Sequence, residues 1–361
     1  MQRRAIFPLL AGAPAILRGA APPPLRLAVI GLVHGHAGGF LHRIAGREDL
    51  KLVGIAEPRS EVRLRYAGRY SLGDTVFYAD TERMLDVAKP DAVAIFTDTV
   101  SHLAAVEACA ARKMPCMMEK PLAVSVDHAR RIQSAAAKAG IPVFVNYETT
   151  WYRSHQALWK LAKEEKQLGA LRKFVVHDGH QGPKAINVQP EFFEWLNDPE
   201  RNGAGAMYDF GCYGANLCTW LLDNRRPKAV TCVAQRIQPS VYTKVEDEAT
   251  IVADYGDAQA IFQASWNWPF NRKDIEVYGE TGYAIALDPT RLRTRLVKQS
   301  EQTVEAPPIA APDDDVVHYL ATIARGQTKP SGLSSVENNL IVTEILEAAR
   351  RSAREGRTIR L

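Results

Sequence analysis

The sequence has no apolar run long enough to cross a membrane, no CxxC pair and no repeat of fixed period. It also has little excess of either charge, because lysine and arginine exceed aspartate and glutamate by only 4. No basic stretch with interleaved aromatic residues occurs, so we predict neither a membrane span nor nucleic-acid binding. What is present is an ordinary globular composition, 46% apolar and 24% charged over 361 residues, enough for two domains.

Cysteines are few, odd in number and scattered. They are Cys109, Cys116, Cys212, Cys218 and Cys232. Buried free thiols are therefore favoured over disulfides. His177, Asp178 and His180 resemble metal ligands but lack a fourth group at suitable spacing, so no metal site is predicted.

The N-terminus carries a twin arginine, Arg3-Arg4, followed by an apolar, alanine-rich stretch to Leu17 and a proline run ending at Pro24. This pattern resembles a twin-arginine export signal and predicts a protein that is periplasmic or secreted. A cytoplasmic tail is the alternative. Residues 1–24 are set apart from the fold for this reason.

From Leu25 onward, short apolar runs alternate with helical patterns. Strands are expected at 27–30, 51–56, 76–78, 91–96, 114–118 and 142–145. This alternation over residues 25–146 predicts an α/β domain with a doubly wound parallel sheet, the Rossmann arrangement that binds dinucleotides. Ligands of such sheets bind outside the carboxyl ends of the strands, so the residues directly after each strand are candidates for a cofactor site.

The loop after the first strand is an imperfect dinucleotide fingerprint. It reads Gly31-Leu32-Val33-His34-Gly35-His36, whereas GxGxxG requires glycine at positions 33 and 36. Gly31 permits the tight turn, but Val33 carries a Cβ where the backbone approaches the pyrophosphate. Gly35 could supply a shifted version of the loop. His34 and His36 either contact phosphate or cap the next helix.

Glu57 follows the second strand, 26 positions after Gly31, near the usual place of the ribose-binding carboxylate. A carboxylate there accepts from the ribose hydroxyls and repels a 2′-phosphate, which favours NAD over NADP. The neighbouring Arg59 keeps NADP open, and a solvated strand-end carboxylate is the non-functional alternative.

Beyond Asn146 the alternation stops. Strands are expected at 171–176, 229–236, 247–255, 258–266, 273–280 and 293–298, with long helices at 209–222 and 336–355. A mostly antiparallel open sheet with helices on one face fits this order, so residues 147–361 are predicted to form an α+β domain for substrate binding and oligomerisation. Trp151 and Tyr152 are candidates to stack on a sugar, and His180 is a candidate donor to it.

Three further segments stand where the chemistry is expected. They are Thr97-Asp98-Thr99-Val100-Ser101-His102 after the fourth strand, Glu119-Lys120-Pro121 after the fifth, and Asp209-Phe210-Gly211-Cys212-Tyr213 at the start of a helix. Together they resemble the Gfo/Idh/MocA family, named after glucose–fructose oxidoreductase, inositol dehydrogenase and a rhizopine-catabolism protein. The resemblance implies a nicotinamide cofactor near Thr97, His102 and Glu119. It also implies a homo-oligomer formed through the open face of the C-terminal sheet.

The resemblance assigns chemistry to Lys120, Asp209 and Tyr213. A lysine at the mouth of the sheet can donate to a substrate hydroxyl or its alkoxide. Tyr213 stands where histidine is commonest in the family, as it does in glucose–fructose oxidoreductase. Because tyrosine titrates near pH 10, we expect Lys120 to lower its pKa so that it can act as base. Asn216, one helical turn on, is expected to face the substrate too. A core aromatic is the alternative for Tyr213.

These residues predict an enzyme that moves a hydride between a sugar or cyclitol hydroxyl and NAD. A first alternative holds the NAD tightly and recycles it, cleaving glycosidic bonds or exchanging redox state between two sugars. A second alternative, prompted by Val33 in the glycine loop, is a non-enzymatic protein that senses a sugar or a dinucleotide.

Overall fold

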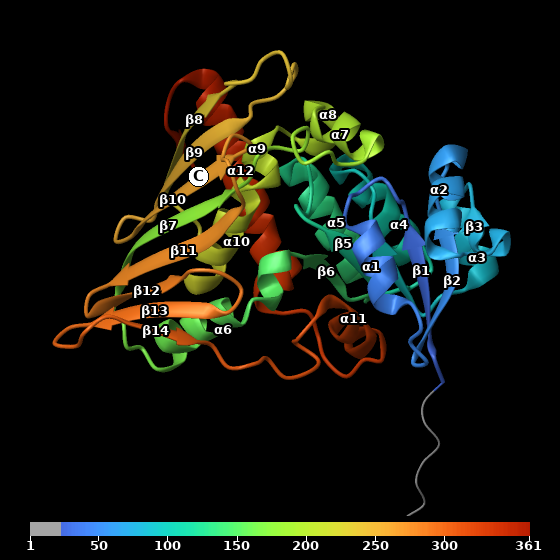
Figure 1. Ribbon diagram of the computed structural model, residues 1–361, viewed down its shortest axis with the longest axis horizontal. Helices are drawn as coiled ribbons and strands as arrows, with labels where there is room; N and C mark the ends of the chain where they lie inside the picture. The colour runs from blue at the N-terminus through green and yellow to red at the C-terminus, as the bar shows by residue number, and fades with distance from the viewer. Residues whose placement is uncertain (1–22) are drawn as a thin grey trace, which may run out of the picture.

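The computed structural model describes residues 23–361, and the predicted export signal lies outside them up to residue 22. The N-terminal half and the C-terminal sheet lie side by side, with helices α10 and α12 between them (Figure 1). None of the helices within 23–361 combines the length and the apolar character that crossing a bilayer requires. All five cysteines are free and buried, as predicted.

The N-terminal sheet is parallel, as predicted. Its strands are β1 (Leu25–Ile30), β2 (Leu50–Ala56), β3 (Phe77–Tyr78), β4 (Ala92–Ile95), β5 (Cys116–Glu119) and β6 (Val143–Asn146). Their order is β3-β2-β1-β4-β5-β6, the doubly wound arrangement. The order reverses between β1 and β4, which is where the crevice for a dinucleotide opens in such folds.

Five helices cover this sheet: α1 (Ala37–Ile44), α2 (Ser60–Tyr70), α3 (Thr81–Ala88), α4 (His102–Ala111) and α5 (Val126–Ala139). Local signals set their ends. The Asp80 side chain accepts from the amide of Arg83 at the start of α3, and Ser125 caps α5 in the same way. Gly140 ends α5 with a φ of 68°, a conformation that favours glycine.

The C-terminal sheet has nine strands in the order β14-β13-β12-β11-β7-β10-β9-β8-β15. They are β7 (Leu171–Gly179), β8 (Ala229–Gln235), β9 (Glu248–Asp254), β10 (Gln259–Ser265), β11 (Arg272–Gly279), β12 (Gly282–Ala286), β13 (Arg291–Leu296), β14 (Gln302–Glu305) and β15 (Ile359–Arg360). Only β7 and β10 pair in parallel, which confirms the mostly antiparallel prediction. Helices α10 (Gly211–Leu221) and α12 (Val336–Glu355) pack on one face.

Several short helices join the two halves: α6 (Arg153–Trp159), α7 (Pro190–Leu196), α8 (Pro199–Asn202), α9 (Ala206–Asp209) and α11 (Val316–Ala324). Helix α11 returns to the N-terminal domain, where Val317 and Leu320 share a core with Leu27 and Phe144. A late segment of the chain therefore completes a core of the N-terminal domain, and the predicted boundary at residue 146 stays a prediction.

Candidate active site

A cavity of about 520 Å³ lies where the two domains meet. Lys120 and Glu148, which follow β5 and β6, line it from the N-terminal domain. Asp209, Tyr213 and Lys273 line it from the C-terminal domain. The cavity opens at the carboxyl ends of the parallel strands, where the sequence places its candidate cofactor and catalytic residues.

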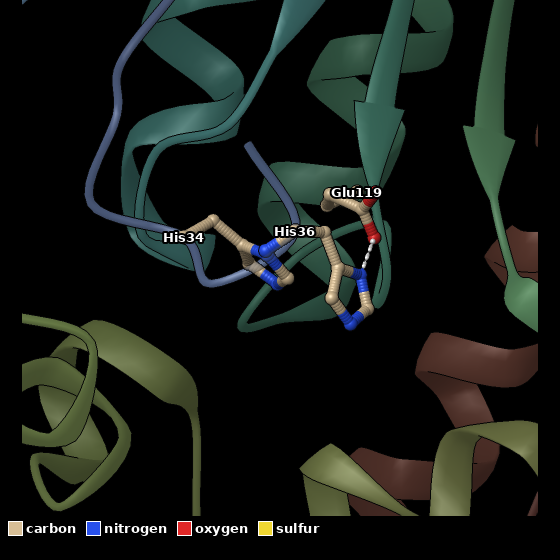
Figure 2. Close-up of side chains that lie close together, drawn as sticks. All are labelled: His34, His36 and Glu119. Atoms are coloured by element: carbon tan, nitrogen blue, oxygen red, sulfur yellow. Dashed lines mark hydrogen bonds and ion pairs between the residues drawn. The ribbon is translucent and has the colours of Figure 1, made fainter. Parts of the chain in front are cut away.

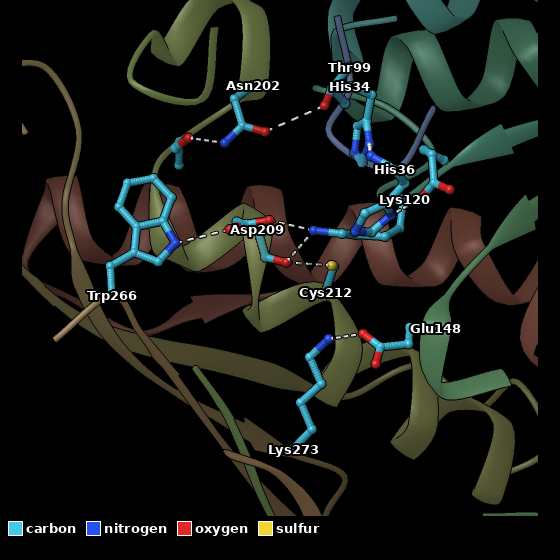
Figure 3. A network of polar contacts seen from close by, with 12 residues as sticks. His34, His36, Thr99, Lys120, Glu148, Asn202, Asp209, Cys212, Trp266 and Lys273 are labelled. Carbon is cyan, nitrogen blue, oxygen red and sulfur yellow. Dashed lines mark hydrogen bonds and ion pairs between the residues drawn. The ribbon is translucent and has the colours of Figure 1, made fainter. Parts of the chain in front are cut away.

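A buried ion pair between Lys120 and Asp209 joins the domains across this cavity (Figure 3). Lys120 Nζ donates to the Asp209 carboxylate and, at 2.8 Å, to its backbone oxygen. The second carboxylate oxygen accepts from Trp266 Nε1 at 2.9 Å. Burial alone would lower the pKa of Lys120, but the Asp209 carboxylate outweighs it and the pKa is raised. The ammonium charge is thus fixed at the site.

Tyr213 is buried at 1% exposure, beside two ammonium groups. The ring centroid lies 5.2 Å from Lys120 Nζ and 4.6 Å from Lys273 Nζ. Burial, reinforced by the nearby Glu148 carboxylate, raises the pKa of Tyr213 well above its usual value. The prediction that Lys120 lowers this pKa is therefore wrong, because desolvation prevails and Lys120 bonds to Asp209 instead. A hydroxyl that stays protonated donates hydrogen bonds more readily than it removes protons.

A second ion pair, between Lys273 and Glu148, lines the same cavity. Lys273 lies on β11, and Glu148 lies in a short 3-10 turn directly after β6. Tyr152 donates its hydroxyl to Glu148 Oε1 at 2.6 Å. Burial would raise the pKa of Glu148, but Lys273 and Tyr152 lower it to about 2. Sequence reasoning missed both charged residues. Glu148 could have been found as a strand-end carboxylate, whereas Lys273 has no local signal.

His34, His36 and Glu119 form a cluster at the start of α1 (Figure 2). His36 Nδ1 lies 3.0 Å from a Glu119 oxygen, and the other oxygen accepts from Asn146 at 2.7 Å. His34 Nδ1 accepts from the His36 amide at 3.2 Å. Burial lowers the pKa of His34, and the positive charge of Lys120 lowers it further. Since that charge also opposes a cation and one nitrogen of each ring is engaged, we assign no metal to this cluster.

A separate cavity of about 390 Å³ lies at the ends of β1, β2 and β4, lined by Gly31, Val33, Glu57 and Thr97. Gly31 has a φ of 80°, and a Cβ there would lie 2.7 Å from Thr97. The Glu57 carboxylate accepts from the backbone amide of Leu32 at 2.9 Å and from that of Arg59 at 3.0 Å. A nucleoside-sized space with a buried carboxylate suits the adenosine end of a dinucleotide.

The segment 190–202, which contains α7 and α8 and is called the α7–α8 strap below, covers the glycine loop. Trp195 donates to the Val33 backbone oxygen at 3.2 Å. Phe192 packs so closely that a Cβ on Gly35 would lie 2.8 Å from its ring. His34 is consequently only 1% exposed, with its ring against those of Phe192 and Trp195. Val33 lines the adenosine-side cavity and Gly35 the larger one, so the strap crosses the path between them.

Ion pairs fasten the strap to the N-terminal domain. Arg65 pairs with Glu191, and Arg59 bonds to Glu194 at 3.2 Å. Arg201, which lies on the strap, bonds to Asp98 of the N-terminal domain at 2.7 Å. Both Arg59 and Asp98 line the adenosine-side cavity, so these pairs sit at its rim.

Two family models match the chain. The one described as "Oxidoreductase family, NAD-binding Rossmann fold" matches residues 25–147. The one described as "GFO/IDH/MocA C-terminal domain" matches residues 155–285. The chain belongs to the Gfo/Idh/MocA oxidoreductase family. Its N-terminal half is accordingly an NAD(P)-binding Rossmann domain.

Relatives within the Gfo/Idh/MocA family act on sugars and cyclitols, by their names. The chain is 26% identical over 342 residues to D-apiose dehydrogenase from Paraburkholderia graminis, covering 89% of this chain and 86% of that one. Aldose-aldose oxidoreductase from Caulobacter crescentus, solved with glycerol, has a TM-score of 0.77 at 23% identity over 94% of this chain and 100% of that one. An inositol dehydrogenase homologue from Azotobacter vinelandii, solved with NAD+, has a TM-score of 0.79 at 19% identity over 94% and 98%. The two structures establish the shared fold.

Three residues that were predicted to contact a ligand bond to other parts of the protein. Asn216 is fully buried and donates to Leu333, so it fixes α10 against the start of α12 and does not line the cavity. His102 is buried too, and its Nδ1 lies 3.2 Å from the Leu122 backbone oxygen, beneath the Glu-Lys-Pro turn. Trp151 donates to Asn146 and lines a neighbouring cavity beside Glu119. Asn216 and His102 therefore make packing contacts in this structure, and the sugar contact of the one and the cofactor contact of the other stay predictions.

Two of the other substrate candidates do reach the large cavity. Tyr152 and His180 both line it. His180 Nδ1 accepts from the Gly182 amide at 2.8 Å, so in the neutral ring the other nitrogen carries the proton and can donate. Burial lowers the pKa of His180, which favours that neutral form.

The loop that carries Asp209 depends on Glu246 and should give a pH-dependent stability. Glu246 Oε1 accepts from the amides of Gly205 and Met207 at 2.8 and 2.9 Å, and burial raises its pKa to about 7. Because the pKa is higher in the folded state than in the unfolded state, protonated Glu246 stabilises the fold at low pH. This contribution is lost as the pH rises through about 7. Between pH ~5 and ~8 we expect the wild type to lose up to about 3 kcal/mol relative to Glu246→Gln, measured by urea unfolding. Parallel pH curves for the two proteins would contradict this expectation.

Proposed function

We propose that this protein is an NAD-dependent dehydrogenase that acts on a CH–OH group of a sugar or cyclitol. The observation that carries the proposal is the buried Lys120–Asp209 pair, which places a fixed ammonium group on the wall of a cavity between the two domains. The names of relatives with the same fold, which include D-apiose dehydrogenase and an inositol dehydrogenase homologue, support the substrate class.

The residues around the cavity fit a nicotinamide dinucleotide. Gly31, Val33 and Glu57 would hold its adenosine end, and Glu119 and Lys120 would lie at its nicotinamide end. When bound, the nicotinamide supplies the hydride acceptor or donor. Because Glu57 repels a 2′-phosphate and Arg59 is bonded to Glu194, we propose NAD over NADP.

Side chains of the protein stabilise the charge on the substrate oxygen and transfer its proton. The Lys120 ammonium stabilises negative charge on the oxygen of the reacting carbon, and Asp209 keeps that ammonium charged and in place. The Tyr213 hydroxyl donates a proton to this oxygen when a carbonyl is reduced. In the oxidative direction the hydroxyl proton passes to the Tyr213 oxygen only after Tyr213 has released its own proton to solvent, with Lys120 holding the negative charge. Because burial raises the pKa of Tyr213, carbonyl reduction is the more favourable direction at neutral pH.

The test combines binding with turnover. Calorimetry with NAD+ and NADP+ on the full chain should show tighter binding of NAD+. A panel of neutral sugars and cyclitols, followed by the absorbance of reduced nicotinamide, should then identify a substrate. Absence of dinucleotide binding would reject the proposal, and binding without any turnover would favour the sensing alternative.

A second candidate function is redox-neutral chemistry with a retained cofactor, as in sugar–sugar exchange or oxidative glycoside cleavage. The α7–α8 strap favours it, because Trp195 and Phe192 cover the loop on which a dinucleotide would lie. A dinucleotide beneath this strap leaves only when the strap moves. An exported enzyme would benefit, and we retain export as a proposal from Arg3-Arg4.

Loosening the strap should accelerate cofactor release. We expect Arg201→Ala, which removes the bond to Asp98, to raise the dissociation rate of NAD about 10-fold, equivalent to about 1.4 kcal/mol. Stopped-flow displacement of bound NADH measures this rate. Arg131→Ala, which breaks an exposed ion pair with Glu107 away from both cavities, is the matched control. An unchanged rate in Arg201→Ala would show that the strap does not limit release.

We also propose a homo-oligomer formed through the face of the C-terminal sheet opposite α10 and α12. Along β8 the residues alternate between buried and exposed positions, and Val233 is 61% exposed. An apolar residue at an outward position of a wide sheet suits a contact with a second copy.

A further inference from the structure

Two lysine–carboxylate pairs lie around Tyr213, and only the first has a role in the mechanism above. Lys120 comes from the N-terminal domain and Asp209 from the C-terminal one. In the second pair the origins are reversed, because Glu148 comes from the N-terminal domain and Lys273 from the C-terminal sheet (Figure 3). The second pair therefore also joins the two domains, and the mechanism above gives it no role.

The second pair is open to a ligand where the first is closed. The side chains of Lys120 and Asp209 are 6% and 9% exposed, whereas those of Lys273 and Glu148 are 19% and 48% exposed. Both members line the 520 Å³ cavity. Among residues 23–361, Glu148 is the one hydrogen-bond acceptor found for Lys273 Nζ, which leaves donor capacity for a ligand in the cavity.

The two ammonium groups line the same cavity and border the same aromatic ring. Lys120 Nζ and Lys273 Nζ lie 5.2 and 4.6 Å from the centroid of the same Tyr213 ring. Because both groups line one cavity of about 520 Å³, we take a hydroxylated ring bound there to present one oxygen to Lys120 and another to the second pair. The oxygen on the reacting carbon and the oxygen on the neighbouring carbon would thus contact different charged groups.

We propose that Glu148 and Lys273 form a clamp that determines specificity for a hydroxyl next to the reacting carbon. A hydroxyl both donates and accepts, so it can donate to Glu148 and accept from Lys273 at once. A carboxylate substituent could accept from Lys273 but would be repelled by Glu148. The clamp thus selects neutral polyols over sugar acids and over deoxy analogues. This inference rests on the proposed function, whose site it deepens.

The charge state of Glu148 keeps this selection constant over the working pH range. Lys273 and Tyr152 lower the pKa of Glu148 to about 2, so its carboxylate stays ionised at neutral pH. Other charged groups on the cavity wall are engaged elsewhere: Arg272 bonds to Asp274, and Asp288 bonds to Arg291. A substrate carboxylate at this position would therefore lie against the Glu148 carboxylate as well as the Lys273 ammonium, whereas a neutral hydroxyl meets no such repulsion.

The test uses Glu148→Gln and Lys273→Met with the best neutral substrate of the panel, its analogue deoxygenated next to the reacting carbon, and the corresponding sugar acid. We expect wild type to prefer the hydroxylated substrate over the deoxy analogue by about 10²-fold in kcat/KM. Each variant should raise KM for the hydroxylated substrate about 10-fold or more and lose most of that preference. Glu148→Gln should also accept the acid better than wild type.

A purely structural role predicts a different pattern, in which both substrates lose activity by the same factor. Glu305→Gln, which breaks an exposed ion pair with Arg153 outside the cavity, is the matched control. Calorimetry with the same ligands on the cofactor-loaded protein tests the clamp even without turnover. Equal affinities of wild type and Glu148→Gln for the polyol and its deoxy analogue would overturn the clamp, whereas failure of dinucleotide binding would overturn the proposed function.

Discussion

Replacing Lys120 with alanine should lower kcat by about 10³-fold or more while NAD binding persists. The ammonium group is the positive charge that Asp209 holds on the cavity wall, and alanine removes the charge that stabilises the substrate oxygen. The adenosine-side cavity at Gly31 and Glu57 does not include Lys120, so dinucleotide affinity should change little. Steady-state kinetics and calorimetry on the same preparation separate the two effects.

The same substitution also leaves the buried Asp209 carboxylate without its partner. Removing one member of a buried ion pair typically destabilises a protein by about 3–5 kcal/mol, so loss of activity could be confused with loss of fold. The double variant Lys120→Met/Asp209→Asn removes both charges, and the amide oxygen that replaces the carboxylate can still accept from Trp266. We expect this double variant to recover most of the stability and none of the activity. A folded double variant with wild-type kcat would reject the mechanism.

Residues at the ends of strands were predictable because the position of a strand end follows from local pattern. Glu57, Glu119 and Lys120 each follow a recognisable apolar run, and a parallel sheet brings such ends to one edge. Lys273 lies near the start of β11, and it reaches the site because β11 pairs with β7 in the middle of a nine-stranded sheet. Strand order and register of this kind are set by long-range packing, so no local pattern reports them.

Helix phase explains why Asn216 packs against a neighbouring helix and does not line the cavity. It lies three residues after Tyr213 on α10, and it donates to the backbone oxygen of Leu333, in the turn before α12, and to Asn339 on α12. The buried Nδ2 group requires such partners, and it finds them between α10 and the start of α12. A sequence can place two residues on adjacent turns, but the neighbour that each one meets depends on how the helix is packed.

The α7–α8 strap packs against the glycine loop after β1. Val33 occupies the second glycine position of the fingerprint, yet its backbone oxygen accepts from Trp195 and its neighbour His34 packs against Phe192. The loop therefore has a protein partner on the side where a bare glycine loop would be open. Its departure from GxGxxG accompanies a covered crevice, which supports the retained-cofactor alternative.

Replacing Tyr213 with phenylalanine should lower kcat about 10²-fold, because it deletes the proton donor and keeps the ring. The ring packs edge-on against Tyr147 at 5.4 Å and stacks with Phe210 at 6.1 Å, contacts that phenylalanine preserves. Little change in thermal stability is therefore expected. Retention of kcat within about twofold would assign Tyr213 to the core, the non-catalytic interpretation.

The histidine variant tests the direction of the pKa shift at Tyr213. Burial raises the pKa of Tyr213, so its hydroxyl remains a proton donor across the usual assay range and carbonyl reduction should not fall with pH on its account. Histidine loses its proton near pH ~6.5, or lower where burial opposes its charge. Tyr213→His should therefore show reductive activity that falls as the pH rises through this range, with oxidative activity retained above it. Superimposable pH–rate profiles for wild type and Tyr213→His would mean that this side chain does not carry the proton.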